Sequence, residues 1–169
     1  KLNLGLDSSD VVRRKVLINR DSSCDATDTT LNQITTSYLS SSDPDRAYLL
    51  SLLGYNIDPA NTPTTLDGLR ASSELRQLGA VMHSSPILLT NQGKISADSS
   101  GALTSSDRQD YILFGTTQGL LHVVDATTGV EKFAFVPNEM VQTQKKAFLK
   151  YDTTSGGTNK MFYGVDAPW

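Results

Sequence analysis

The sequence predicts a mainly β fold with a few short helices, and the stretch 110–136 carries that prediction. Its β-branched and aromatic residues fall into short runs that favour strands. The runs span residues 111–114, 120–124 and 132–136. The linkers between them are rich in Gly, Asp and Thr, and Gly119 and Gly129 suit a backbone that must reach positive φ. This pattern is typical of an antiparallel meander, which needs neighbouring elements to bury its faces.

A fourth strand of the meander is expected upstream, at residues 84–90. Pro86 would open it, where a missing N–H does least harm. Residues 91–109 are rich in Ser, Gly and Asp, and we expect them to form a long polar loop that is exposed and functional, or disordered. Residues 160–166 are expected to begin a further strand.

A short helix is expected at residues 45–53. Ser42 or Asp43 would cap it, Pro44 would take the first helical position, and Gly54 would end it. The apolar residues 49, 50, 52 and 53 would give this helix one buried face.

A second helix is expected at residues 138–150, with Asn138 as its N-cap and Glu139 in the first turn. Upstream, residues 15–19 favour a strand. Residues 21–36 are rich in Asp, Ser and Thr and indicate a loop.

Composition narrows the function classes. The net charge is −3 without a basic stripe, which disfavours direct nucleic-acid binding. No apolar run has the roughly 18–20 residues that span a bilayer, so no membrane span is expected. Cys24 is the single cysteine, which excludes an internal disulfide and a Cys-based zinc site. The first residue is Lys1 rather than Met, so we expect a processed product or a piece of a longer protein.

The end of the meander resembles a blade of the quinoprotein-like β-propellers. The blade motif is Ala-x-Asp-x-x-Thr-Gly-x-x-x-Trp, and the matching residues here are Val123, Asp125, Thr128, Gly129 and Phe133. Val and Phe replace the usual Ala and Trp. Asp125 and Thr128 can bind backbone amides inside the turn, so the motif indicates architecture rather than catalysis.

Several landmarks follow one another in an order that resembles the C-terminal propeller domain of the PilC/PilY family, the tip-associated adhesins of bacterial type IV pili. The landmarks are residues 76–86, 114–125, 129–139 and 163–166. Residues 49–54 also fit the helix and glycine that precede the propeller in this family. The resemblance covers roughly residues 45–169. Ala80, Thr117-Gln118 and residues 167–169 depart from the family pattern.

This resemblance implies a pre-propeller segment at residues 1–78 and an incomplete β-propeller at residues 79–169, with one full four-stranded antiparallel blade and the start of the next. It implies a non-enzymatic role in type IV pilus assembly and pilus-tip adhesion, with surface attachment, twitching motility and DNA uptake. The implied partners are minor pilins, other pilus components and a host-cell or abiotic surface. The implied location is the cell surface, at the pilus tip or outer membrane of a Gram-negative bacterium.

The family also implies calcium, held by an acidic loop of alternating Asp residues. Asp21, Asp25 and Asp28 lie near one another, but their spacing does not match such a loop. We therefore expect no metal site and no cofactor in this segment, and a family calcium site elsewhere in the full-length protein.

Two histidines are the obvious candidates for chemistry, and neither is expected to be catalytic. His83 precedes Ser84 and Ser85, but no carboxylate near it in the sequence would orient it as a base. A strand-start histidine that bonds backbone is the favoured interpretation, and His122 is expected to be a packed or edge histidine. Residues 115–119 lack the Lys-Ser/Thr of a phosphate loop and are expected to form a hairpin turn.

Two alternatives share the blade motif. One is a piece of a quinone-dependent dehydrogenase, which would need a calcium-bound cofactor cradled by several blades. The other is an outer-membrane assembly scaffold of the BamB type, which uses such blades without a cofactor.

Overall fold

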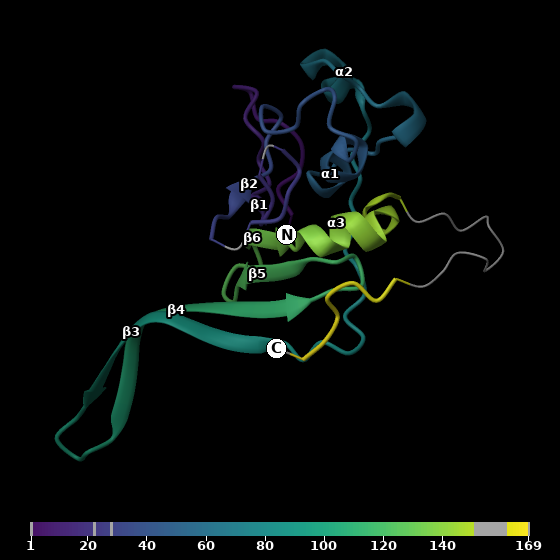
Figure 1. The fold of residues 1–169 in the computed structure, drawn as a ribbon. Coiled ribbons are helices and arrows are strands. Elements are labelled where there is room, and N and C mark those ends of the chain that lie inside the picture. Colours follow the sequence, from purple (N-terminus) through teal and green to yellow (C-terminus); the bar gives the residue numbers. More distant parts are fainter. Residues whose placement is uncertain (1, 22, 28, 151–161, 169) are drawn as a thin grey trace.

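One open, six-stranded mixed sheet forms the centre of the molecule in a computed structural model that describes residues 2–21, 23–27, 29–150 and 162–168 (Figure 1). The strands lie in the order β2-β1-β6-β5-β4-β3. Their bounds are β1 Val16–Ile18, β2 Asn32–Gln33, β3 Ile87–Ala97, β4 Leu103–Gly115, β5 Leu121–Asp125 and β6 Glu131–Val136. Neighbouring strands are antiparallel except β1 and β6, which are parallel.

The predicted meander is confirmed as the consecutive strands β3 to β6. Gly119 and Gly129 have φ of +91° and +68° at its tight turns, as their positions required. Asp125 accepts hydrogen bonds from the backbone amides of Thr127 and Thr128, so the turn part of the blade motif works as expected. The fold is mainly β, but the sheet is open in the described residues and a propeller is not confirmed.

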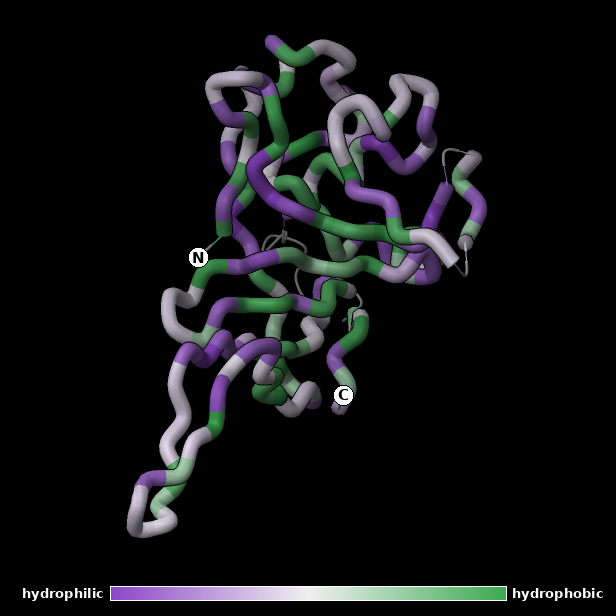
Figure 2. The backbone as a smooth tube through the Cα atoms, turned by 90° about the vertical axis from the view of Figure 1, so that its left-hand side faces the viewer, coloured by the Kyte–Doolittle hydropathy of each residue, from purple (hydrophilic) through white to green (hydrophobic). Residues whose placement is uncertain are grey.

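The prediction of a loop at residues 91–109 is wrong. β3 and β4 continue through this stretch and project as a two-stranded arm (Figures 1 and 2). Ile95 and Leu103 alternate with polar residues, and Asp98 closes the arm by accepting hydrogen bonds from two backbone amides. Cross-strand pairing therefore outweighs the low hydrophobicity of the stretch, although the register shifts between Thr90 and Lys94.

The N-terminal part adds helices α1 (Arg46–Leu52) and α2 (Leu66–Ala71) and a 3-10 turn at Pro59–Asn61. The first predicted helix is confirmed as α1, and Gly54 follows it with φ of +97°. Its predicted start is wrong, because Pro44 lies in the preceding turn and Asp45 is the N-cap, without a side-chain capping bond. Asp43 instead accepts a hydrogen bond from the Asp45 amide.

The second predicted helix is confirmed as α3 (Asn138–Gln144) and the 3-10 turn η2 (Lys145–Phe148). Asn138 is not the N-cap, since Pro137 takes that position and the Asn138 amide donates to the side chain of Asn19. The predicted strand at 15–19 is confirmed as β1. The predicted loop at 21–36 holds the short strand β2.

The core lies between the sheet and α1 with η2. Val16, Ile18, Ala134 and Val136 of the sheet are fully buried there with Phe148 of η2. The four predicted apolar residues of α1 and its end, Leu49, Leu50, Leu52 and Leu53, are also fully buried. β1 thus ties the predicted pre-propeller segment into the same sheet as the meander, while the division at residue 78 stays a prediction.

The strand predicted at 160–166, as the start of a second blade, is wrong for its described part. Residues 160 and 161 lie outside the described residues, and residues 162–168 contain a turn at 164–165 and no strand. Gly164 has φ of +57°, and the side chain of Asp166 is bound by backbone amides, so local hydrogen bonding replaces strand pairing.

Candidate functional site

Three landmark segments meet at one end of the meander and form what we call the three-segment junction. They are residues 77–84, 115–120 and 162–166. The amide of Thr117 donates to the carbonyl of Ala80 at 3.0 Å, and the Ala80 amide donates to the Thr117 hydroxyl at 3.0 Å. Segments far apart in the sequence are thereby interlocked.

Two glycines make this interlocking possible. A Cβ on Gly79 would lie 2.5 Å from the amide nitrogen of Gln118. A Cβ on Gly164 would collide with the carbonyl oxygen of Thr116 and the amide nitrogen of Gly119. Both obstacles are backbone atoms, which cannot rotate away as a side chain would, so the junction accepts only glycine at these positions.

The carboxylate of Asp166 is the centre of the junction and is fully buried. It accepts hydrogen bonds from the backbone amides of Met82, His83 and Ser84 at 2.9–3.0 Å. Burial alone would raise the pKa of Asp166, but these amides favour the charged form and hold the pKa below its ordinary value. Asp166 therefore stabilises the entry to β3 as a charged group.

His83 and Ser84 lie beside this carboxylate. Nδ1 of His83 is 3.2 Å from Asp166 Oδ2, and the His83 side chain is 59% exposed. Sequence reasoning missed this carboxylate, because Asp166 lies 83 residues downstream of His83. The Ser84 hydroxyl accepts a hydrogen bond from the Gly115 amide at 2.9 Å. Ser84 therefore anchors β4, and nothing here presents its hydroxyl as a nucleophile.

His122 belongs to a buried network of charged groups on the core side of the sheet. Its Nδ1 donates to Glu131 Oε1 at 2.7 Å, and Glu131 binds Arg14 through both oxygens at 2.7 and 2.9 Å. Arg14 also donates to the carbonyl of Leu52 at 2.5 Å. The ring of Phe114 stacks on His122 at 5.1 Å. His122 is 1% exposed, in agreement with a packed histidine.

Burial and charge act in opposite directions on this network. Burial lowers the pKa of His122 and favours the neutral imidazole, although Glu131 opposes that shift. Burial would raise the pKa of Glu131, but Arg14 and His122 outweigh it and lower the pKa to about 2. Glu131 is therefore ionised at neutral pH and balances the charge of Arg14.

Several apolar side chains of the junction and of the first half of β3 are exposed, and we call this set the apolar edge. Its members are Leu78, Val81, Met82, Ile87, Leu88, Leu89 and Tyr163, and their exposed fractions run from 39% to 64%. β3 is also the last strand of the sheet, so one side of its backbone is unpaired in the described residues. Exposed apolar patches of this kind are typical of protein contact sites.

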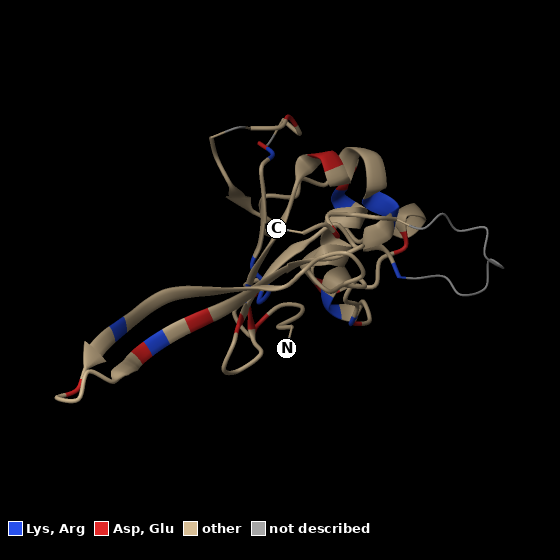
Figure 3. Ribbon diagram, turned by 90° about the horizontal axis from the view of Figure 1, so that it is seen from below, with Lys and Arg blue, Asp and Glu red and all other residues tan. Residues whose placement is uncertain are grey.

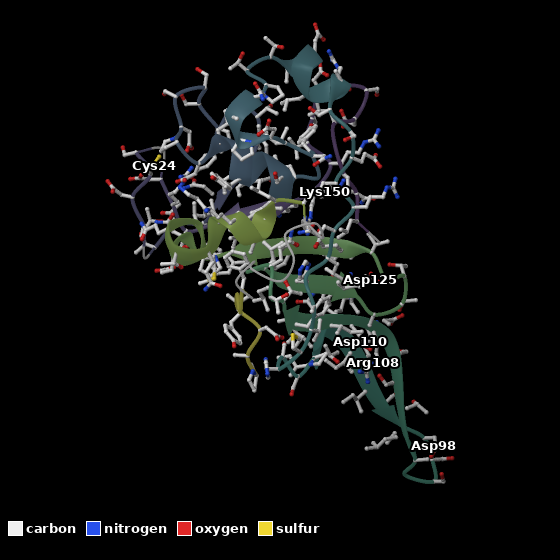
Figure 4. All side chains as sticks on the ribbon, turned by 90° about the vertical axis from the view of Figure 1, so that its right-hand side faces the viewer. Cys24, Asp98, Arg108, Asp110, Asp125 and Lys150 are labelled. Atoms are coloured by element: carbon white, nitrogen blue, oxygen red, sulfur yellow. The ribbon has the colours of Figure 1, made fainter. Side chains whose placement is uncertain are left out.

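The arm is more polar than the apolar edge. Basic and acidic residues are interleaved along it (Figure 3), and Lys94 pairs with Asp107 as Arg108 pairs with Asp110. Figure 4 places Arg108 and Asp110 together near its base and Asp98 at its tip. The arm thus has no surplus of one charge that would select an ionic partner.

Two further kinds of site come into question for the described residues, a metal centre and a membrane-spanning helix. Among the described residues, no group of three or more His, Cys, Asp or Glu is placed to hold a metal ion. Asp21 accepts hydrogen bonds from the amides of Ser23 and Asp25, and Asp28 lies outside the described residues. No described helix is long and apolar enough to cross a membrane. The absence of catalytic, cofactor and metal residues stays a prediction.

Comparison with known proteins finds sequence similarity to one curated protein over part of this chain. No family model matches the chain, and no solved structure matches it. An alignment over 112 residues, which covers 60% of this chain, is 32% identical to the type IV pilus biogenesis factor PilY1 of Pseudomonas aeruginosa (strain UCBPP-PA14). The match covers 9% of that protein, so the chain spans a small part of its length. The similarity supports a relationship to type IV pilus proteins.

Proposed function

We propose that this chain is a non-catalytic binding module of a type IV pilus protein, and that it acts in pilus assembly and tip adhesion at the cell surface. The similarity to PilY1, a pilus biogenesis factor, is the observation that carries this proposal. The proposed partners are minor pilins, other pilus components and the surface to which the pilus attaches.

The geometry supports a binding role over a catalytic one. At the junction, Asp166 and Ser84 bind backbone groups, and in the core His122 and Glu131 bind each other and Arg14. These polar side chains hold segments in place, which gives a rigid support for the exposed apolar edge beside them. The meander of β3 to β6 would in turn serve as one blade of a propeller in the longer protein.

An exchange experiment tests the pilus role. The matched stretch of PilY1 is replaced by the corresponding stretch of this chain, and surface pili and twitching are measured in P. aeruginosa. We expect pili and twitching to be retained in part. A second exchange carries Asp166→Ala, which removes the carboxylate from the junction, and should lose both. Equal loss in the two exchanges, with both proteins present at normal amounts, would contradict the proposal.

A binding experiment tests the role of the apolar edge. The purified 169-residue chain is immobilised, and purified minor pilins are passed over it. Leu88→Ser should weaken binding at least tenfold, because Leu88 is 61% exposed at the sheet edge. Ile95→Ser changes an equally apolar side chain on the arm, 78% exposed, and serves as the matched control. Binding that neither substitution changes would exclude the apolar edge.

The enzyme and scaffold alternatives are separated by two further measurements. Protein prepared with added quinone and calcium should show no quinone absorbance band and no dehydrogenase activity. Binding to outer-membrane assembly components in place of minor pilins would favour the scaffold alternative.

A further inference from the structure

The buried network of Arg14, Glu131 and His122 joins the N-terminal part of the chain to the sheet. We propose that it is an acid-sensitive lock, in which protonation of His122 loosens residues 11–20 from β5 and β6 while the meander stays folded. This inference is independent of the pilus role.

The network has a place for an additional proton but no charge to balance it. Nε2 of His122 lies 3.4 Å from the hydroxyl of Thr116, which lies 3.2 Å from the carbonyl of Leu120. A proton on Nε2 can therefore be donated to Thr116, while Thr116 donates to Leu120. The cluster then holds two cations, Arg14 and His122, around the single carboxylate of Glu131. These three side chains are 1–3% exposed, so water cannot solvate the surplus charge without an opening.

The N-terminal side is the side that can open. The charged groups near His122 are Glu131 from β6 and Arg14 from the segment before β1. The neutral residues Phe114 and Thr116 also contact the His122 ring. β4 and β5 are bound by five antiparallel residue pairs, and β5 and β6 by four, with one register shift between Val123 and Val124. β1 pairs with β6 over three residues, Val16–Ile18.

Repulsion between the two cations is relieved when the Arg14 side chain moves away from His122. The hydrogen bond from Arg14 to the Leu52 carbonyl of α1 is then broken. The direction of the pKa shift agrees with this account. Burial lowers the pKa of His122, Glu131 opposes this shift, and Arg14 adds to it. The net shift is downward, so protonation acts against the closed arrangement.

Hydrogen exchange of the 169-residue chain at pH 7.5 and pH 5.5, corrected for the intrinsic pH dependence of exchange, tests the lock. In the wild-type chain, amides of residues 11–20 should exchange about fivefold or more faster at pH 5.5, and amides of residues 111–125 should not change. His122→Gln keeps an N–H donor toward Glu131 but does not titrate, and should abolish the acid effect. The chain has two histidines, so His83→Gln is the matched control and should retain the effect.

Three results would overturn the lock. One is an acid effect of equal size in wild type and His122→Gln. Another is faster exchange spread evenly over the chain, which would indicate loss of global stability. If His122→Gln fails to fold, NMR follows the two imidazole signals of the wild-type chain instead. The third contradicting result is then a His122 that protonates between pH 7.5 and 5.5 without faster exchange at residues 11–20.

Discussion

The buried carboxylates of Asp166 and Glu131 are stabilised by different kinds of donor. Asp166 is held mainly by backbone amides, and Glu131 by the side chains of Arg14 and His122. Sequence patterns could not identify the partners His83 and Arg14, because they lie 83 and 117 residues from their carboxylates along the chain. The short-range interaction of Asp125 with Thr127 and Thr128 was predictable, since the turn itself encodes it.

Loss of the Asp166 carboxylate should destabilise the protein strongly. Asp166→Ala leaves three backbone amides without their acceptor at a buried site, and we expect a loss of about 3 kcal/mol in the free energy of unfolding. Denaturant unfolding measures it. The control is His83→Ala, which removes an exposed ring and should cost less than about 1 kcal/mol. Similar losses in both variants would show that the histidine, rather than the amides, holds the carboxylate.

Glycine at position 164 is required for two reasons that can be separated. Gly164→Ala places a Cβ against the backbone of the 116–119 turn at a positive φ, and should cost at least about 3 kcal/mol. Gly129→Ala also places a Cβ on a residue with positive φ, but this Cβ would have no atom within 4 Å. The substitution should therefore cost about 1–2 kcal/mol in the free energy of unfolding. Thermal and denaturant unfolding of the two variants give the difference, and equal costs would exclude the steric term.

Among the secondary-structure elements, those with local signals were the ones predicted correctly. β3 to β6 follow from short apolar runs and Gly turns, and α1 from four apolar residues followed by Gly54. The arm at residues 91–109 was missed because its polar residues resemble a loop, whereas cross-strand pairing decides its structure. β2 was missed because two residues carry no periodicity.

In the described residues one kind of turn occurs at residues 7–9, 21–23 and 98–100, each of which has the sequence Asp-Ser-Ser. In each turn the Asp carboxylate accepts backbone amides from two and four residues downstream. The fourth residue has a positive φ: Asp10 at 62°, Cys24 at 71° and Gly101 at 83°. Glycine is therefore used in one of three equivalent positions.

Replacing the fourth residue of the second turn with glycine should stabilise the protein. Cys24→Gly removes the unfavourable contact of a Cβ at positive φ, and we expect a gain of about 0.5–1 kcal/mol in unfolding free energy. Gly101→Ala makes the reverse change in the equivalent turn of the arm and should be destabilising. A loss of stability in Cys24→Gly would mean that packing of the thiol outweighs the backbone term.

Removal of the arm should leave the rest of the protein folded. Residues 92–108 are exposed, with no contact to the core, so a short Asn-Gly turn between Asn91 and Gln109 should change the melting temperature by less than about 5 °C. Circular dichroism melting measures this. A variant that unfolds would show that the distal pairing supports the meander.

At the scale of the whole molecule, the sheet has a topology that no local pattern predicts. β1 lies parallel to β6, although the paired residues Val16 and Ala134 are 118 positions apart in the sequence (134 − 16). The pairing depends on where α1 and η2 place the core. Position in a sheet is decided by such long-range packing. The sequence could therefore predict the order of the meander strands but not the place of β1 and β2 in the sheet, and a closed propeller remains a proposal.

Stability of the whole chain should fall in acid in a range that Glu131 defines. Its pKa is about 2 in the folded protein and near 4.5 in the unfolded chain, so unfolding takes up a proton between these values. The stabilisation is complete above pH 4.5 and is lost as the pH falls toward 2, with a total on the order of 3 kcal/mol. Urea unfolding at several pH values measures the slope. Arg14→Met removes the main cause of the low pKa of Glu131, so the slope of unfolding free energy against pH should become flatter below pH 4.5. The same substitution should lower stability at pH 7, because Glu131 loses its buried partner. An unchanged slope in this variant would assign the acid dependence to other carboxylates instead, such as Asp125, whose pKa is also lowered to about 2.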